Sequence, residues 1–144
     1  MQLKKSWPLP SFPKPIVIIG AGGIVNDAHI PAYRKANFDV IGLYDVVRKK
    51  ALHTAKKWGL KSYTSLDGFI SDAEENEAIF DLATPPSAIQ GILKIIPVGS
   101  TVLIQKPMGE EEWAIQQESL KRLNSILLDG VAQQSKVIGH QPYI

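Results

Sequence analysis

The clearest chemistry in this sequence lies in a glycine-rich turn that follows a short apolar stretch. Ile16-Val17-Ile18-Ile19 leads directly into Gly20-Ala21-Gly22-Gly23-Ile24. The first glycine allows a sharp turn, and the second lets backbone approach a pyrophosphate, which the N–H groups of a following helix can bind. The turn therefore predicts a dinucleotide ligand. The residues of the turn expected to contact this ligand are Gly20, Gly22, Gly23 and Ile24.

An acidic residue fits the same ligand. Asp45 follows an expected strand over residues 38–44. A carboxylate about 20 residues beyond the glycine turn can accept hydrogen bonds from the adenosine ribose, and it repels the extra phosphate of NADP. Arg48 and Lys49 lie just beyond and can partly offset that repulsion. We expect Asp45 and Arg48 to contact the cofactor, with NAD preferred and NADP possible.

Two further clusters follow expected strands over residues 78–83 and 101–104. In open α/β sheets the ligand lies at the carboxyl ends of the strands, so both clusters should face the crevice of the glycine turn. The residues expected to contact the cofactor there are Ala83, Thr84, Pro85, Pro86, Gln105 and Lys106.

The elements that must position these residues alternate between strands and helices. The strands are continuous β-branched runs, which is typical of a parallel sheet covered by helices on both faces. The sequence therefore predicts an α/β, doubly wound Rossmann domain over residues 16–144. Strands are expected at 16–19, 38–44, 61–63, 78–83, 101–104 and 136–139. Helices are expected from about residue 22 with an interruption at Pro31, at 46–58, as a turn at 65–71, from Pro85 to before Pro97, and at 110–129.

Residues 1–15 carry four prolines and read as an extended N-terminal arm. Two interpretations stay open for this arm: a strap packed on the domain surface, or a segment that binds a partner through its aromatic side chains.

Composition excludes several classes of protein. The chain has 144 residues, a formal net charge of +2 and no cysteine. The small charge gives no indication of nucleic-acid binding, and no apolar run reaches the ~18 residues of a membrane helix. The histidines have no spacing typical of a metal site, so no metal is expected. We expect a cytoplasmic protein.

Two alternatives to the dinucleotide interpretation remain open. The glycines could serve only the turn of a doubly wound domain. A methyltransferase also uses a glycine-rich turn and an acidic residue after the second strand, although it would not explain the clusters at Thr84 and Lys106.

Taken together, these motifs resemble the Gfo/Idh/MocA oxidoreductases. The resemblance rests on the segments Gly20-Ala21-Gly22-Gly23-Ile24, His29-Ile30-Pro31-Ala32, Asp45, Asp81-Leu82-Ala83-Thr84-Pro85-Pro86 and Lys106-Pro107. It implies a nicotinamide dinucleotide on this domain and hydride transfer to or from a sugar, cyclitol or related polyol. It further implies a second α/β domain that supplies most of the substrate pocket. The chain is then either an N-terminal fragment of a longer protein or a stand-alone domain, and we favour the fragment. We expect it to have little or no activity alone, and a homo-oligomer is possible for the full-length protein.

The resemblance also suggests a catalytic residue and reveals departures. In the family the lysine matched by Lys106 lies near the nicotinamide, where its charge would stabilise a developing alkoxide. This chain has Gln105 where the family usually has glutamate, and Ile89 where a histidine is frequent. Both departures favour the alternative of a nucleotide-binding sensor or scaffold without catalysis.

Single residues outside these motifs carry weaker expectations. Asp81 interrupts an apolar strand, and a buried carboxylate needs a partner. We expect either a strand-end residue bonded to backbone N–H groups or a group of the cofactor site near Thr84. His29 is expected to be a structural residue at a helix junction, and Val25 should push its helix slightly away from the sheet because it replaces a small residue.

Overall fold

A computed structural model describes residues 8–105 and, for its backbone only, residues 124–127. Within these residues six parallel strands form one sheet in the order β3-β2-β1-β4-β5-β6. This is the strand order of doubly wound dinucleotide-binding domains, so the predicted fold class is confirmed. The strands are β1 Ile16–Ile19, β2 Val40–Tyr44, β3 Lys61–Ser62, β4 Ile79–Leu82, β5 Thr101–Ile104 and β6 Asn124–Leu127.

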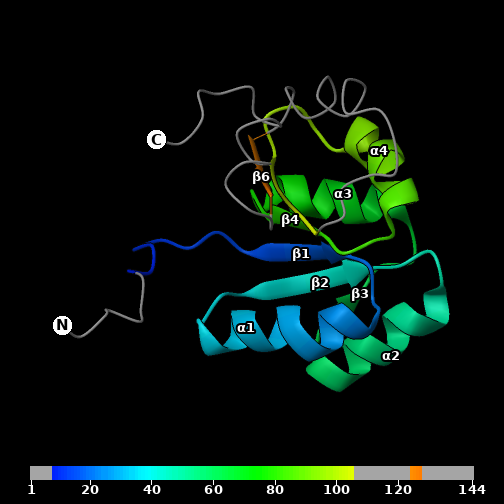
Figure 1. Cartoon of the computed structure of the whole chain (residues 1–144), viewed down its shortest axis with the longest axis horizontal. Coiled ribbons are helices and arrows are strands. Elements are labelled where there is room, and N and C mark those ends of the chain that lie inside the picture. Colours follow the sequence, from blue (N-terminus) through cyan, green and yellow to red (C-terminus); the bar gives the residue numbers. More distant parts are fainter. Residues whose placement is uncertain (1–7, 106–123, 128–144) are drawn as a thin grey trace.

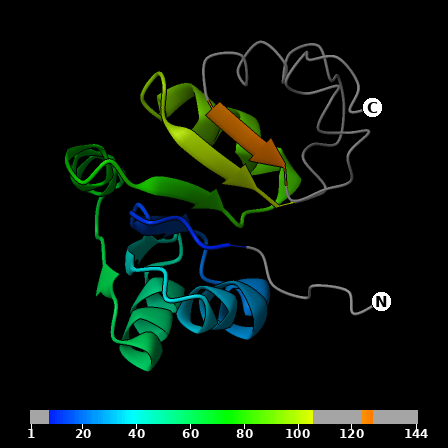
Figure 2. The same cartoon turned by 90° about the vertical axis from the view of Figure 1, so that its left-hand side faces the viewer.

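Helices cover both faces of the sheet (Figures 1 and 2). The described helices are the π-helical η1 Val25–His29, which continues into α1 Ile30–Lys35, then α2 Arg48–Trp58, α3 Leu66–Glu75 and α4 Pro86–Ile95. Elements η1, α1 and α2 pack on one face, and α3 and α4 pack on the other. Local signals set several ends: the Ser65 hydroxyl caps α3 by accepting from Gly68 N–H at 3.1 Å, and Gly59 ends α2 with a positive φ of 67°.

The alternation of side chains along the central strands divides the core into two layers. Val17, Ile19, Phe80 and Leu82 pack under α3 and α4, whereas Ile16 and Ile18 pack under η1, α1 and α2. Asp81 lies between Phe80 and Leu82, so it points into the second layer, and its side chain is fully buried.

One predicted element is wrong. The expected helix over 110–129 conflicts with β6, whose backbone pairs with β5 from Thr101↔Asn124 to Ile104↔Leu127. The residues themselves explain the correction, because asparagine and serine are poor inside a helix and pairing removes an open edge at β5. The rest of that range and the expected strand at 136–139 lie outside the described residues.

The described part of the N-terminal arm does not lie on the domain as a packed strap. The ring of Phe12 is 93% exposed and Leu9 is 57% exposed. Pro15 joins the arm to the sheet, since its carbonyl accepts from Ile79 N–H at 2.8 Å. Among the described helices none is long and apolar enough to cross a membrane.

Candidate functional site

The glycine turn is held between the ends of β2 and β4. Gly20 N–H donates to Tyr44 O at 2.8 Å, and Ala83 N–H donates to Ile19 O at 2.9 Å. Gly20 has a φ of 115°, and a Cβ added there would lie 2.3 Å from Ala83 O. The structure thus brings the predicted residues Gly20 and Ala83 into contact, at a distance that only glycine permits.

The next position of the turn is open. A Cβ added to Gly22 would meet no heavy atom of the described chain within 4 Å. Gly22 and Gly23 precede η1, and the first N–H groups of a helix have no intrahelical acceptor. Backbone can therefore be approached by a ligand at Gly22 from outside the fold.

Asp45 faces this turn. Its Oδ2 accepts from Ala21 N–H at 2.9 Å, and its Oδ1 accepts from Val47 N–H at 2.7 Å. The residue is half-buried. A carboxylate offers about four lone-pair sites, so each oxygen retains capacity for a further donor such as a ribose hydroxyl.

Three side chains that were not predicted from the sequence stabilise the turn through hydrogen bonds. The Asn26 amide donates to Gly22 O and to Thr54 Oγ1, both at 3.0 Å, and the Thr54 hydroxyl donates to Ala21 O at 3.4 Å. Trp58 Nε1–H completes the support by donating to Asn26 Oδ1 at 3.0 Å. The turn carbonyls Gly22 O and Ala21 O are thus satisfied by side chains of η1 and α2. The sequence feature that could have predicted these hydrogen bonds is Thr54, a polar residue on the buried face of α2.

The Thr84 cluster lies at the end of β4, beside the glycine turn. Thr84 Oγ1 is buried and has no hydrogen-bond partner within the described chain. Pro85 and Pro86 begin α4 as its N-cap and first residue. The site thus offers three features that fit the polar groups of a dinucleotide. They are the unpartnered Thr84 hydroxyl, the open backbone at Gly22 and the remaining acceptor capacity of Asp45.

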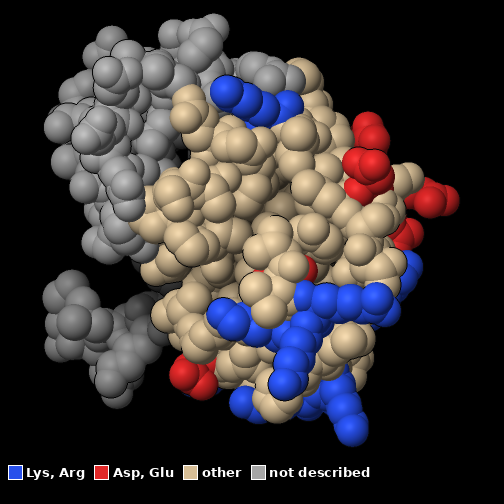
Figure 3. Space-filling view, turned by 90° about the vertical axis from the view of Figure 1, so that its right-hand side faces the viewer, with Lys and Arg blue, Asp and Glu red and all other residues tan. Residues whose placement is uncertain are grey.

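Charge on this edge of the molecule is unevenly distributed. Figure 3 looks onto the side toward which β1 and β2 run, and its lysine and arginine side chains gather over the half that holds α2. Arg48, Lys49 and Lys50 are exposed at the start of that helix, as is Ile24 in the turn. A positive surface beside Asp45 favours an anionic ligand.

A second group of polar side chains, which we call the polar cluster, lies between the sheet and the helix formed by η1 and α1. It consists of His29, Tyr33, Asp81 and Gln105. The Asp81 Oδ2 atom lies 2.7 Å from both His29 Nδ1 and Tyr33 OH, and His29 Nε2 lies 3.2 Å from Gln105 Oε1. The partners of Asp81 are therefore side chains of the neighbouring helix, and the expectation of backbone N–H partners is wrong.

Burial and the Asp81 carboxylate set the titration of the cluster. The hydrogen bond to Asp81 raises the pKa of His29 most strongly, with desolvation opposing it and Gln105 adding to it. Burial, reinforced by Asp81, raises the pKa of Tyr33 far above its usual range, so its hydroxyl remains a donor. Asp81 Oδ1 is buried without a partner among the described residues.

The raised pKa of His29 predicts how stability depends on pH. The folded chain holds this proton more tightly than the unfolded chain, whose histidine titrates near 6.5. The bond therefore stabilises the fold fully below about pH 6.5, and the free energy of unfolding should decrease as pH rises through the folded pKa. Urea denaturation between pH 6 and 9 measures this decrease. The variant Asp81→Asn should flatten it, and an equal slope in both proteins would contradict the assignment.

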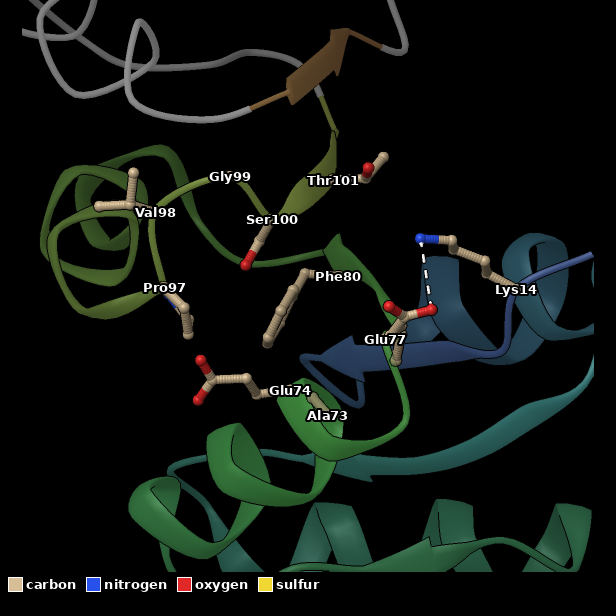
Figure 4. A pocket seen from close by; sticks show the side chains of 11 residues that line it. Lys14, Ala73, Glu74, Glu77, Phe80, Pro97, Val98, Gly99, Ser100 and Thr101 are labelled. Atoms are coloured by element: carbon tan, nitrogen blue, oxygen red, sulfur yellow. Dashed lines mark ion pairs between the residues drawn. The ribbon is translucent and has the colours of Figure 1, made fainter.

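A pocket of about 200 Å³ lies elsewhere on the molecule. Figure 4 shows it between the end of α3 and the segment before β5, lined by Glu74, Glu77, Ser100 and Thr101, with Lys14 paired to Glu77 at 3.9 Å. These residues lie where β4 and β5 begin, the opposite end of the sheet from the glycine turn. The pocket is therefore separate from the candidate site.

Two further predictions concern the catalytic residue of the candidate site and the binding of a metal ion. Lys106, the expected catalytic residue, lies outside the described residues. Within the described part of the chain no group of three histidine, aspartate or glutamate side chains could hold a metal ion.

Known proteins share this fold and its sequence pattern. Residues 14–128 match the GFO_IDH_MocA family, described as an oxidoreductase family with an NAD-binding Rossmann fold. No curated protein matches the chain closely enough to add to this finding.

Solved dehydrogenases have similar structures. GenD2 from gentamicin A biosynthesis, in complex with NAD, has a TM-score of 0.72 at 17% identity, over 86% of this chain and 37% of its own. The WlbA dehydrogenase from Bordetella pertussis, in complex with NADH and UDP-GlcNAcA, has a TM-score of 0.62 at 20% identity, over 80% of this chain and 34% of its own. Dehydrogenase MviM from Clostridium difficile has a TM-score of 0.66 at 18% identity, over 80% of this chain and 39% of its own. At these identities the likeness is one of fold, and the chain spans less than two fifths of each structure.

Proposed function

Because the chain belongs to the Gfo/Idh/MocA oxidoreductase family, we propose that its glycine turn, Asp45 and the Thr84 cluster bind the dinucleotide of a sugar or polyol dehydrogenase. The observation that carries this proposal is the turn itself: Gly20 lies against Ala83, Gly22 is open to approach, and the Asp45 carboxylate reaches the turn at Ala21 N–H.

Each element of the site has a distinct role in this proposal. The N–H groups at the start of η1 bind the pyrophosphate, and the Asp45 carboxylate accepts from the adenosine ribose hydroxyls. Thr84 and Gln105 lie at the ends of β4 and β5 and contact the other half of the cofactor. The bound nicotinamide would supply hydride transfer, and Lys106 would stabilise charge on the reacting oxygen.

The substrate class is part of the proposal and is supported by similar structures. The WlbA structure contains UDP-GlcNAcA, and GenD2 belongs to gentamicin A biosynthesis. We therefore propose a sugar or related polyol as substrate of the whole protein, with a second domain providing most of its pocket. The sensor alternative rests only on the departures at Gln105 and Ile89, and the family match adds nothing in its favour.

The basic test is titration of the 144-residue chain with NADH, NADPH and S-adenosylmethionine by calorimetry. We expect saturable NADH binding and none of S-adenosylmethionine. Absence of NADH binding at millimolar concentration would reject the proposal.

Cofactor preference provides a sharper test at Asp45. Replacing Asp45 by alanine removes a charged acceptor, so NADH should bind about tenfold to a hundredfold more weakly. NADPH should lose less, because repulsion of its extra phosphate is also removed, and the nearby Arg48 would then face that phosphate. The ratio of NADH to NADPH affinity, measured by fluorescence titration, should fall at least about tenfold.

Two variants make the result specific to Asp45. Asp45→Asn removes the charge but keeps one acceptor oxygen, which can still receive Ala21 N–H while Val47 N–H loses its acceptor. It therefore tests charge repulsion with the turn less disturbed than in Asp45→Ala. Asp39→Ala removes an exposed carboxylate at the opposite end of β2 and should leave both affinities unchanged. An unaltered affinity ratio in Asp45→Ala would show that this carboxylate does not contact the ribose.

A further inference from the structure

Two hydrogen bonds of the polar cluster have a fixed direction, because both end on the Asp81 carboxylate. Asp81 Oδ2 receives the Tyr33 hydroxyl and faces His29 Nδ1, each at 2.7 Å. A carboxylate can only accept, so Nδ1 carries a proton whether the imidazole is charged or neutral. Only Nε2 of His29 is then left to change its protonation.

The Nε2 atom of His29 faces the Gln105 side chain. A protonated Nε2 donates to Gln105 Oε1, which lies 3.2 Å away in the structure. The amide nitrogen of Gln105 has no partner among the described residues. When Nε2 is neutral it can only accept, and the amide must turn over to donate to it. The two states of His29 therefore leave opposite ends of the Gln105 amide unpaired.

The orientation of the Gln105 amide matters because this residue lies at the candidate cofactor site. Its backbone N–H donates to Leu82 O at 3.1 Å, which fixes the residue at the carboxyl ends of β4 and β5. The next residue along β4 is Ala83, which contacts the glycine turn. Gln105 therefore lies at the carboxyl end of the sheet, where a ligand binds in open α/β folds.

We propose that His29 is a positioning residue that holds the Gln105 oxygen, so that the amide NH₂ donates to an acceptor oxygen of the bound nucleotide or substrate. This inference rests on the proposed function for its ligand but not for its internal geometry. The glutamate that is usual in the resembling family could only accept at this place. The glutamine of this chain therefore reverses the polarity of the contact.

The surroundings of His29 support the charged state. The groups facing its ring in the described structure are Asp81 from β4, Tyr33 from α1 and Gln105 after β5. The raised pKa of His29 means that Nε2 keeps its proton to a higher pH than in a free histidine. Lys106 follows Gln105 directly in the sequence, so the orientation of this residue also bears on the expected catalytic position.

The first arm of the test needs no cofactor. In ¹⁵N-labelled protein, both His29 ring nitrogens should show imidazolium shifts at pH 6.5, with the signal assigned by its loss in His29→Gln. As pH rises, Nε2 alone should lose its proton, and the Gln105 side-chain NH₂ signals should move with the same midpoint. In Asp81→Asn that shared midpoint should shift to lower pH. A neutral His29 ring at pH 6.5, or amide signals that ignore its titration, would overturn the proposal.

The second arm measures NADH affinity against pH. Gln105→Leu keeps the volume but removes the amide, so NADH should bind about twofold to tenfold more weakly at pH 6.5. This difference from the wild-type chain should vanish above the midpoint of His29. The matched control is Gln90→Leu, a half-buried glutamine on α4 at the other face of the sheet, whose affinity should equal that of the wild type. A Gln105→Leu affinity equal to wild type at pH 6.5 would overturn the contact.

The two arms separate this inference from the proposed function. If the wild-type chain fails to bind NADH at any pH, the proposed function fails, and the spectra still decide whether His29 orients Gln105. If NADH binds and the amide signals do not follow His29, the positioning role alone is rejected.

Discussion

Replacing Gly20 by alanine is expected to lower the free energy of unfolding by about 3–5 kcal/mol. The φ of 115° is strained for any L residue, at a cost of about 1–3 kcal/mol. The added Cβ would also lie 2.3 Å from Ala83 O, and both atoms belong to the closely packed junction of β1 and β4. Since a domain of this size is stable by about 5–15 kcal/mol, the variant should lose a substantial part of its stability. Urea denaturation followed by far-ultraviolet circular dichroism measures the loss.

A second glycine separates the clash from the backbone strain. Gly59 also has a positive φ, of 67°, but a Cβ there would meet nothing within 4 Å of the described chain. Gly59→Ala should therefore cost only about 1 kcal/mol, the penalty of the left-handed conformation. If Gly20→Ala were no more destabilising than Gly59→Ala, the close approach of the glycine turn to β4 would be wrong.

The fold could be predicted because its signals are local. The strand β1 is a run of β-branched residues that ends at a glycine, Ile16–Ile19 before Gly20, whereas β4 has the less regular sequence Ile79-Phe80-Asp81-Leu82. Short apolar runs favour a sheet buried on both faces, and the alternation with helices then favours a doubly wound topology. The doubly wound class and the position of the glycine turn after the first strand could thus be predicted without any knowledge of side-chain contacts, whereas the strand order came from the structure.

The wrong prediction at β6 shows that local sequence signals do not reveal pairing between distant segments. The segment around Asn124–Leu127 contains leucines that suit a helix, yet its neighbour across the sheet is β5, which needs a hydrogen-bonding partner. Strand pairing between distant residues is a tertiary effect, and it outweighed a weak helical preference.

The polar cluster was hidden for a related reason. A buried aspartate in an apolar strand predicts that a partner exists but does not identify it. His29 and Tyr33 are separated from Asp81 by about fifty residues, and four residues apart they lie on one face of the η1–α1 helix. The i, i+4 spacing of two polar aromatic side chains on an otherwise buried face was the signal that could have pointed to Asp81.

Replacing Gly22 by alanine is expected to weaken dinucleotide binding while leaving the fold intact. The position has no positive φ and no described atom within 4 Å of an added Cβ, so the free energy of unfolding should change by less than about 0.5 kcal/mol. The same methyl group would occupy the path by which a pyrophosphate reaches the backbone. A forced steric adjustment of about 1–3 kcal/mol corresponds to roughly a fivefold to 150-fold weaker NADH affinity.

The matched control places the same substitution outside the crevice. Gly91 lies on the exposed side of α4, where a Cβ also meets nothing within 4 Å, and Gly91→Ala should bind NADH as the wild type does while gaining up to about 1 kcal/mol of stability. Calorimetric titration of the three proteins, after their unfolding curves are compared, measures both effects. Binding by Gly22→Ala at wild-type affinity would mean that no phosphate approaches this turn. A Gly22→Ala variant that binds weakly but unfolds normally would place the ligand at the glycine turn, because only the approach from outside the fold has been altered.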